Sequence, residues 1–470
     1  SDFFFFFLKG QPAQSDFLPK ICQHVTSNIV NFKTGHVGFT IRLEGIPFDG
    51  SDDKHLFNQY VNLSNLFAGM GKSLGNNLAV WTTLQRKKIN FDRRYSFTTE
   101  FCQQFANKYL ARFQEEDYFE NVFYITVLIK SDDLDDGIKE AEEQINIMMR
   151  SLQPYEPYLL TAYQNDEGTL FSEVYEFFGG LINGEKEQIP LSTLDAYQVI
   201  PSADLHFGSE VCEIRTPSGA QKYGVMYDLK DFGLSKPKIL TGVLSLPCEF
   251  TLTQSLVYVN SHTMQEDIKK QLNNLKSVGD QAAEQQNELA YGLGQLTAGE
   301  LMFGDYHAAL VVYGKTAKEA SYNGSRAYAA FLNAGGFRFT KGGLSAPATF
   351  FSQVPGSKEK PRSFPKTTAN LATTFGIHNY SHGKKYGNPI GDGSAVMPLQ
   401  TVSKTVYDFN FHFSNPKEDN VGDKIAGHTL ILGATGTGKT TLQTALLAFN
   451  ERFDPYIFAL DLDRGMEIFI

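Results

Sequence analysis

The chain has 470 residues, which at about 150 residues per domain suggests about three domains. Apolar residues make up 42% and charged residues 20% of the chain, a balance that supplies buried cores and excludes a disordered chain. The net charge of −10 argues against a basic surface that grips nucleic acid along the whole chain, and it leaves a local basic patch open. No stretch approaches the roughly 20 apolar residues of a membrane span. The cysteines lack C-x-x-C spacing, which disfavours a disulfide framework and a zinc site and fits a reducing cytoplasm: Cys22, Cys102, Cys212 and Cys248.

Strand and helix patterns alternate through the first 400 residues, as in an α+β protein. Residues 28–46 predict a β-hairpin, 78–85 and 122–129 predict strands, and 97–113 between them predicts a helix. A helix is also expected over 132–152, where apolar residues recur at alternating steps of four and three. We expect Ser131 to cap it. The four aspartates within 132–136 favour the positive end of this helix over a calcium loop, because the later Glu ligand of such a loop is missing.

The patterns continue with a strand at 251–260, a helix from near Thr263, a strand at 308–313 and a helix at 316–333. Proline and basic residues at 355–366 predict a surface loop. Breaks in the pattern near 240 and again at 400–425 suggest two boundaries. They give an N-terminal α+β domain over 1–240, a second α+β or helical subdomain over 241–410, and a third region over 411–470.

The third region contains a phosphate-binding motif of the form G-x-x-x-x-G-K-T. The apolar residues 429–432 predict a strand directly before it, and 439–449 predict a helix directly after it. Glycines let the loop curl so that backbone N–H groups converge on an anion, and the helix N-terminus adds its dipole. Lys439 is expected to contact the β- and γ-phosphates, Thr440 to bind Mg²⁺, and Thr441 to steady the first turn or contact the α-phosphate. The expected nucleotide-binding residues are Gly433, Ala434, Thr435, Gly436, Thr437, Gly438, Lys439, Thr440 and Thr441.

A second strand is predicted over 456–460 and ends in two carboxylates, Asp461 and Asp463. Carboxylates at the C-terminal end of a parallel strand lie on the ligand side of a doubly wound sheet, so either could orient water or metal. A turn beside Gly465 explains the pair equally well. His378 and His382 have metal-ligand spacing for a helix, but the glycines around them favour a loop without metal.

Several segments resemble the large transport ATPases of bacterial type IV secretion and conjugation systems, the VirB/TrbE/CagE class. The resemblance rests on the phosphate loop with residues 427–432 before it, on 15–19 and 43–48, on 350–356, on 409–413 including His412, and on 461–465. It implies an N-terminal α+β region followed by a RecA-like α/β ATPase domain, which in this chain breaks off after about two strands. It also implies ATP and Mg²⁺ as cofactors, a hexamer, and a place at the cytoplasmic face of the inner membrane.

The resemblance further implies partners among the other secretion subunits. One is a small inner-membrane subunit that docks near the N-terminal region, which makes 1–240 the expected docking domain. The chain starts at Ser1 without methionine and stops in an apolar run, so we expect a segment of a longer protein. The Walker B, sensor and arginine-finger residues would follow Ile470, and the chain alone is therefore expected not to hydrolyse ATP.

Three functions compete at this point. The favoured one is an ATPase motor that energises assembly of a secretion channel or passage of DNA or protein through it. The second is a DNA-pumping translocase of the related motor class, and the third is a non-enzymatic docking platform in a membrane complex. The five consecutive phenylalanines at 3–7 either pack into the chain's own core or contact a membrane partner or the bilayer interface: Phe3, Phe4, Phe5, Phe6 and Phe7.

Overall fold

A computed structural model describes residues 14–233, 240–278, 283–462 and 464–467. The phenylalanines at 3–7 and Asp463 lie outside these residues, so the structure says nothing of them. The chain forms two compact units, one of Ser1–Lys87 with Asn121–Asn379 and the other of Lys88–Glu120 with Tyr380–Ile470. The mixed α/β character expected from the sequence is confirmed, and the boundaries near 240 and 410 stay a prediction.

The first unit is built on a large sheet, which has thirteen strands among the described residues. Its main path runs β1-β2-β3-β6-β5-β13-β14-β12-β11-β10, with β7, β15 and β16 paired to the side of β3, β12 and β14. The strands along this path are β1 (Ile21–His24), β2 (Val30–Phe32), β3 (His36–Leu43), β6 (Phe119–Lys130), β5 (Leu78–Lys88), β13 (Phe250–Tyr258), β14 (Phe303–Gly314), β12 (Gln221–Asp231), β11 (Cys212–Arg215) and β10 (Asp204–Phe207). The side strands are β7 (Pro157–Leu159), β15 (Arg338–Lys341) and β16 (Phe364–Thr367), and a separate pair joins β4 (Ile46–Pro47) to β17 (His378–Asn379).

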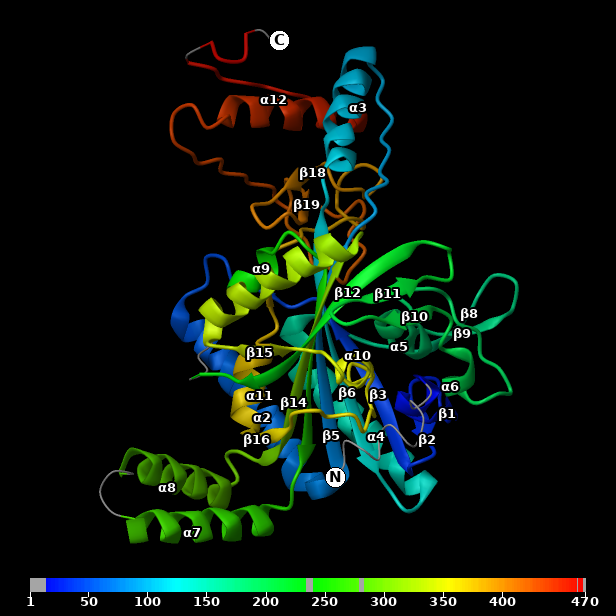
Figure 1. The fold of residues 1–470 in the computed structure, drawn as a ribbon. Helices are drawn as coiled ribbons and strands as arrows, with labels where there is room; N and C mark the ends of the chain where they lie inside the picture. The colour runs from blue at the N-terminus through cyan, green and yellow to red at the C-terminus, as the bar shows by residue number, and fades with distance from the viewer. Residues whose placement is uncertain (1–13, 234–239, 279–282, 463, 468–470) are drawn as a thin grey trace. The chain divides into compact units, whose positions relative to one another are not determined.

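Helices cover both faces of the central strands (Figure 1). One face carries α2 (Asp53–Leu74), α4 (Leu134–Ser151), α9 (Ala317–Gly335) and α11 (Thr368–Phe375), and the other carries α5 (Glu173–Ile182) and α10 (Ala346–Phe351). Nearly every residue of β5, β6, β13 and β14 is therefore buried, and burial in these strands does not alternate from one residue to the next. Two further helices, α7 (Ser261–Val278) and α8 (Ala283–Ala298), follow β13 and precede β14 in the chain and pack on each other.

The predicted elements of this unit are confirmed, with two corrections. Asp133, rather than Ser131, caps α4, because its carboxylate accepts the N–H of Asp136 at 3.0 Å. The Ser131 hydroxyl donates instead to the Asp133 carbonyl oxygen at 2.7 Å. The predicted loop at 355–366 ends in strand β16, because residues from Phe364 onwards pair with the edge of β14.

The second unit contains α3 (Glu100–Glu115), the two-stranded pair β18 (Met397–Gln400) and β19 (Val406–Phe409), and α12 (Lys439–Asn450) (Figure 1). The predicted helices at 97–113 and 439–449 are confirmed. The strands predicted at 429–432 and 456–460 are wrong, because neither segment is paired. Leu430, Leu432 and Phe458 are 80%, 81% and 87% exposed. An extended segment needs a neighbour for its backbone hydrogen bonds, and none of the described residues of this unit lies alongside as that neighbour.

Candidate functional site

The phosphate-loop motif folds as a tight turn that leads straight into α12. Gly436 and Gly438 have φ angles of +79° and +89°, a left-handed conformation that side chains with a Cβ rarely adopt. Gly438 is the N-cap, and its carbonyl oxygen accepts the N–H of Leu442 at 2.9 Å. The first N–H groups of any helix have no partner within it, so those of α12 are available to an anion at the loop.

Gly433 is required by close packing inside the loop. A Cβ at this position would lie 2.7 Å from the Thr437 hydroxyl and 3.3 Å from Cγ of Lys439. The Thr437 hydroxyl donates to the Ala434 carbonyl oxygen at 2.7 Å and closes the turn. The glycines of the motif therefore allow the tight turn that leads into α12.

The Lys439 ammonium lies folded back over the loop. Its Nζ donates to the carbonyl oxygens of Gly433 and Ala434, at 2.8 Å each. Both acceptors are neutral, and the loop is exposed to solvent. A phosphate would offer the ammonium a charged acceptor, and charge-assisted hydrogen bonds are about twice as strong as neutral ones. The arrangement thus places a positive charge where the motif chemistry requires it.

The predicted metal ligand Thr440 is exposed at the start of α12, and the turn after the second apolar run lies beside it. A Cβ built on Gly465 would be 3.7 Å from the Thr440 hydroxyl oxygen. In this turn Asp461 accepts the N–H of Met466 at 2.7 Å. This hydrogen bond stabilises the turn beside Gly465, which was one of the two roles that the sequence allowed for Asp461. The other role, orienting water or metal, stays a prediction.

The far end of α12 is anchored in an aromatic cluster that the sequence analysis missed. Phe449 is fully buried, and four rings from residues 95–109 surround it with their planes nearly perpendicular to its own. Their centroids lie 5.6–6.3 Å away, the range of favourable edge-to-face pairs: Tyr95, Phe97, Phe105 and Tyr109. Recurrence of aromatic residues every fourth position through 97–113 was the available signal.

Polar contacts complete this anchor. The Glu451 carboxylate accepts the backbone N–H groups of Thr98 and Thr99, at 3.1 Å each, just where α3 begins. The Arg452 guanidinium donates to the Val396 carbonyl oxygen at 2.7 Å and lies over the ring of Tyr95. Burial of the Arg452 guanidinium lowers its pKa.

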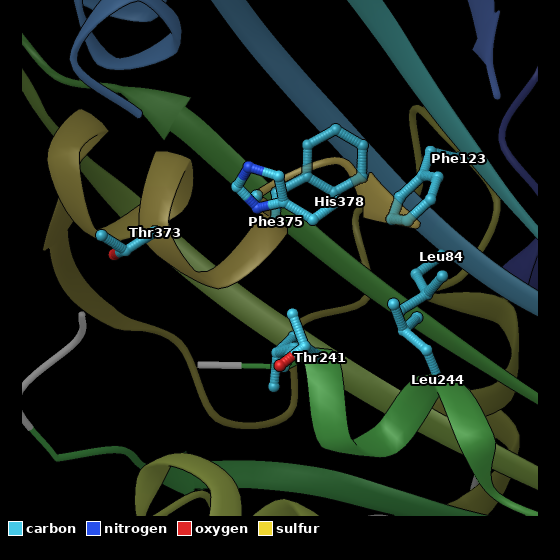
Figure 2. Close-up of a pocket in the computed structure, with 9 residues that line it drawn as sticks. Leu84, Phe123, Thr241, Leu244, Thr373, Phe375 and His378 are labelled. Atoms are coloured by element: carbon cyan, nitrogen blue, oxygen red, sulfur yellow. The ribbon is translucent and has the colours of Figure 1, made fainter. Parts of the chain in front are cut away.

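Two hollows of the first unit fit a nucleotide poorly. A cavity of about 20 Å³ between the sheet and α11 holds about one water molecule, whereas ligand sites span about 300–1,000 Å³ (Figure 2). His378 lines it and bonds Gln59 at 3.1 Å, and His382 belongs to the second unit. A surface hollow of about 390 Å³ carries three glutamates, Glu173, Glu176 and Glu187, which repel phosphate. No group of three or more potential metal ligands occurs within the described ranges.

Comparisons with known proteins agree with the resemblance seen in the sequence. Residues 159–361 match the family described as "CagE, TrbE, VirB family, component of type IV transporter system". Residues 28–136 match the family described as "Type IV secretion system ATPase VirB4/TrbE, N-terminal domain".

Curated relatives match along nearly the whole chain. The type IV secretion system protein virB4 of Bartonella quintana is 27% identical over 98% of this chain and 60% of its own length. That of Brucella melitensis is 28% identical over 95% of this chain and 56% of its own length. PtlC of Bordetella pertussis is 26% identical over 98% and 59%. The chain thus spans a little over half the length of these relatives, and it belongs to the CagE/TrbE/VirB family of type IV secretion system components.

Proposed function

We propose that this chain carries the nucleotide-binding loop and the N-terminal region of an ATPase that energises a type IV secretion system. The observation that carries the proposal is the loop at 433–440. It combines left-handed glycines, an ammonium over the loop carbonyls and an immediate helix N-terminus. Together these provide donors and positive charge for the phosphates of ATP.

The finer parts of the proposal rest on the family. The loop would bind ATP with Mg²⁺ at Thr440, inside a RecA-like domain that begins near residue 411. The working protein would be a hexamer at the cytoplasmic face of the inner membrane, bound to other secretion subunits. One partner would be a small inner-membrane subunit near the N-terminal region. The work of the ATPase would be to assemble a conjugation or secretion channel or to move DNA or protein through that channel. Among the described residues, no helix is both long and apolar enough to cross a bilayer.

The test is Lys439→Ala in the full-length protein. We expect ATP binding and hydrolysis to fall to background while the circular dichroism spectrum and melting temperature stay near wild type. The lysine bonds only exposed loop carbonyls, so its loss removes ligand charge without opening a core cavity. Lys424→Ala is the matched control, an exposed lysine outside the loop, and should leave turnover unchanged.

The same turnover and binding assays test the alternative functions. Wild-type turnover by Lys439→Ala would refute the phosphate-loop assignment. A strong rise in wild-type turnover on addition of DNA would favour the DNA-pumping translocase. ATP binding without turnover by the full-length protein would favour the docking platform.

A further inference from the structure

The nucleotide-binding helix has two ends with different neighbours. Its N-terminal end opens onto the phosphate loop, and its C-terminal end is held by residues 88–120, which we call the arm. Resting on the proposed function, we propose that the arm positions α12, so that nucleotide binding at the loop and the packing of the arm are energetically coupled. Glu451 is the positioning residue that joins the two.

Apolar contacts hold α12 against the arm. Ala445, Leu446 and Phe449 are buried against α3 in one cluster with Ala106 and Leu110. The cluster also includes the stacked rings of Phe91 and Phe113 within the arm, 4.4 Å apart. Close-packed clusters of this kind transmit displacement, because they have little free volume to absorb it. A shift of α12 at the phosphate loop therefore displaces the residues of the arm that pack against it.

Glu451 adds two hydrogen bonds to the arm, whose geometry depends on the orientation of α12. Its two carboxylate oxygens accept one backbone N–H each from Thr98 and Thr99, where the positive end of the α3 dipole lies. The Thr99 hydroxyl accepts the N–H of Cys102 and caps the same helix, so Glu451 completes a cap that the arm only partly makes for itself. Rotation or translation of α12 would strain both charge-assisted bonds at once.

The length and connections of these elements make them suited to carry such a signal. At 1.5 Å per residue, the 12 residues of α12 span about 18 Å from the phosphate loop to the helix end next to Glu451. The arm is continuous with β5 at one end and with β6 at the other, and both strands lie in the large sheet. Coupling between two sites is reciprocal, so a change that loosens the arm must also change nucleotide affinity.

The experiment measures both directions in the full-length protein. Hydrogen–deuterium exchange over 97–113 is followed with and without Mg-ATP, and ATP affinity is measured by titration. In wild type we expect Mg-ATP to slow exchange over 97–113. In Glu451→Gln, which keeps the shape and removes the charge, this protection should shrink and the Kd for ATP should rise about fivefold or more. Glu451→Asp, which restores the charge, should recover part of both effects.

Controls separate the outcomes. Glu115→Gln changes an exposed carboxylate at the other end of α3 and should behave as wild type in both measurements. If wild type binds ATP but exchange over 97–113 does not change, or if Glu451→Gln binds ATP as wild type does, the positioning role is refuted while the proposed function stands. If wild type binds no ATP, both the proposed function and the positioning role of the arm are refuted.

Discussion

Replacing Phe449 by alanine should release α12 from its anchor. The ring is fully buried and has four aromatic neighbours, so its removal opens a cavity and deletes several edge-to-face pairs. Large-to-small changes of a buried phenylalanine cost about 3–5 kcal/mol. Each aromatic pair contributes about 0.5–1.5 kcal/mol beyond the area that it buries, and these values overlap with the cavity cost, so they do not add to it. We therefore expect a loss of about 3–5 kcal/mol in local stability.

The assay is native-state hydrogen exchange of the amides in 439–450. The only tryptophan, Trp81, lies in the first unit, so its fluorescence does not report on α12. A loss of about 3–5 kcal/mol corresponds to exchange faster by about two to four orders of magnitude. Phe101→Ala is the matched control, since that ring belongs to the same arm but is 64% exposed. Equal effects of Phe449→Ala and Phe101→Ala would refute the view that Phe449 anchors α12.

Three further predictions concern other parts of the chain. Thr440→Ala should weaken ATP binding measured with Mg²⁺ more than binding measured in EDTA, and equal losses would contradict a metal-ligand role. Gly314→Ala should cost about 1–3 kcal/mol in urea unfolding, because its Cβ would lie 2.3 Å from the Ala320 nitrogen, whereas Gly343→Ala has open space and should cost far less. Burial raises the pKa of Cys212 to about 12, above the value of an unfolded thiol, so the folded state keeps a proton that the unfolded state loses at alkaline pH. The contribution of the Cys212 proton to the free energy of unfolding is therefore complete below about pH 9 and is lost as pH rises toward 12. Between these pH values, the free energy of unfolding of Cys212→Ala, measured by urea unfolding, should decline less steeply than that of wild type.

The sequence predicted the strands and helices of the first unit well because their signals are local. Strands such as β5 and β13 carry the β-branched and aromatic residues of buried strands, and α4 carries a regular apolar stripe. The cap of α4 was misplaced by two residues because Ser131 and Asp133 are both good caps, and backbone geometry alone decides between them. The order of strands in the sheet could not be predicted, since the pairings β3–β6, β5–β13 and β12–β14 join strands that are not consecutive in the chain.

The phosphate loop was predictable for a different reason. Its motif fixes residue type and spacing over eight positions, and the left-handed glycines and the helix start follow the motif directly. The anchor of α12 was not predictable in the same way. Glu451 and Thr99 are 352 residues apart in sequence, and neither belongs to a recognisable motif. Only folding brings the arm and the end of α12 together.

The two wrongly predicted strands bear on what stabilises the phosphate-loop motif. In a doubly wound sheet, the strand before a phosphate loop usually holds the loop in place. Here the described residues on either side of the loop and α12 form no strand, with Leu432 81% and Leu460 87% exposed, yet Gly436 and Gly438 keep their left-handed turn and α12 is formed. The helix packs on the arm along its apolar side from Leu442 onwards, and Phe449 and Glu451 fix its far end. Among the described residues, the packing of Ile431, α12 and its anchor against the arm therefore supports the loop without a paired strand beside it.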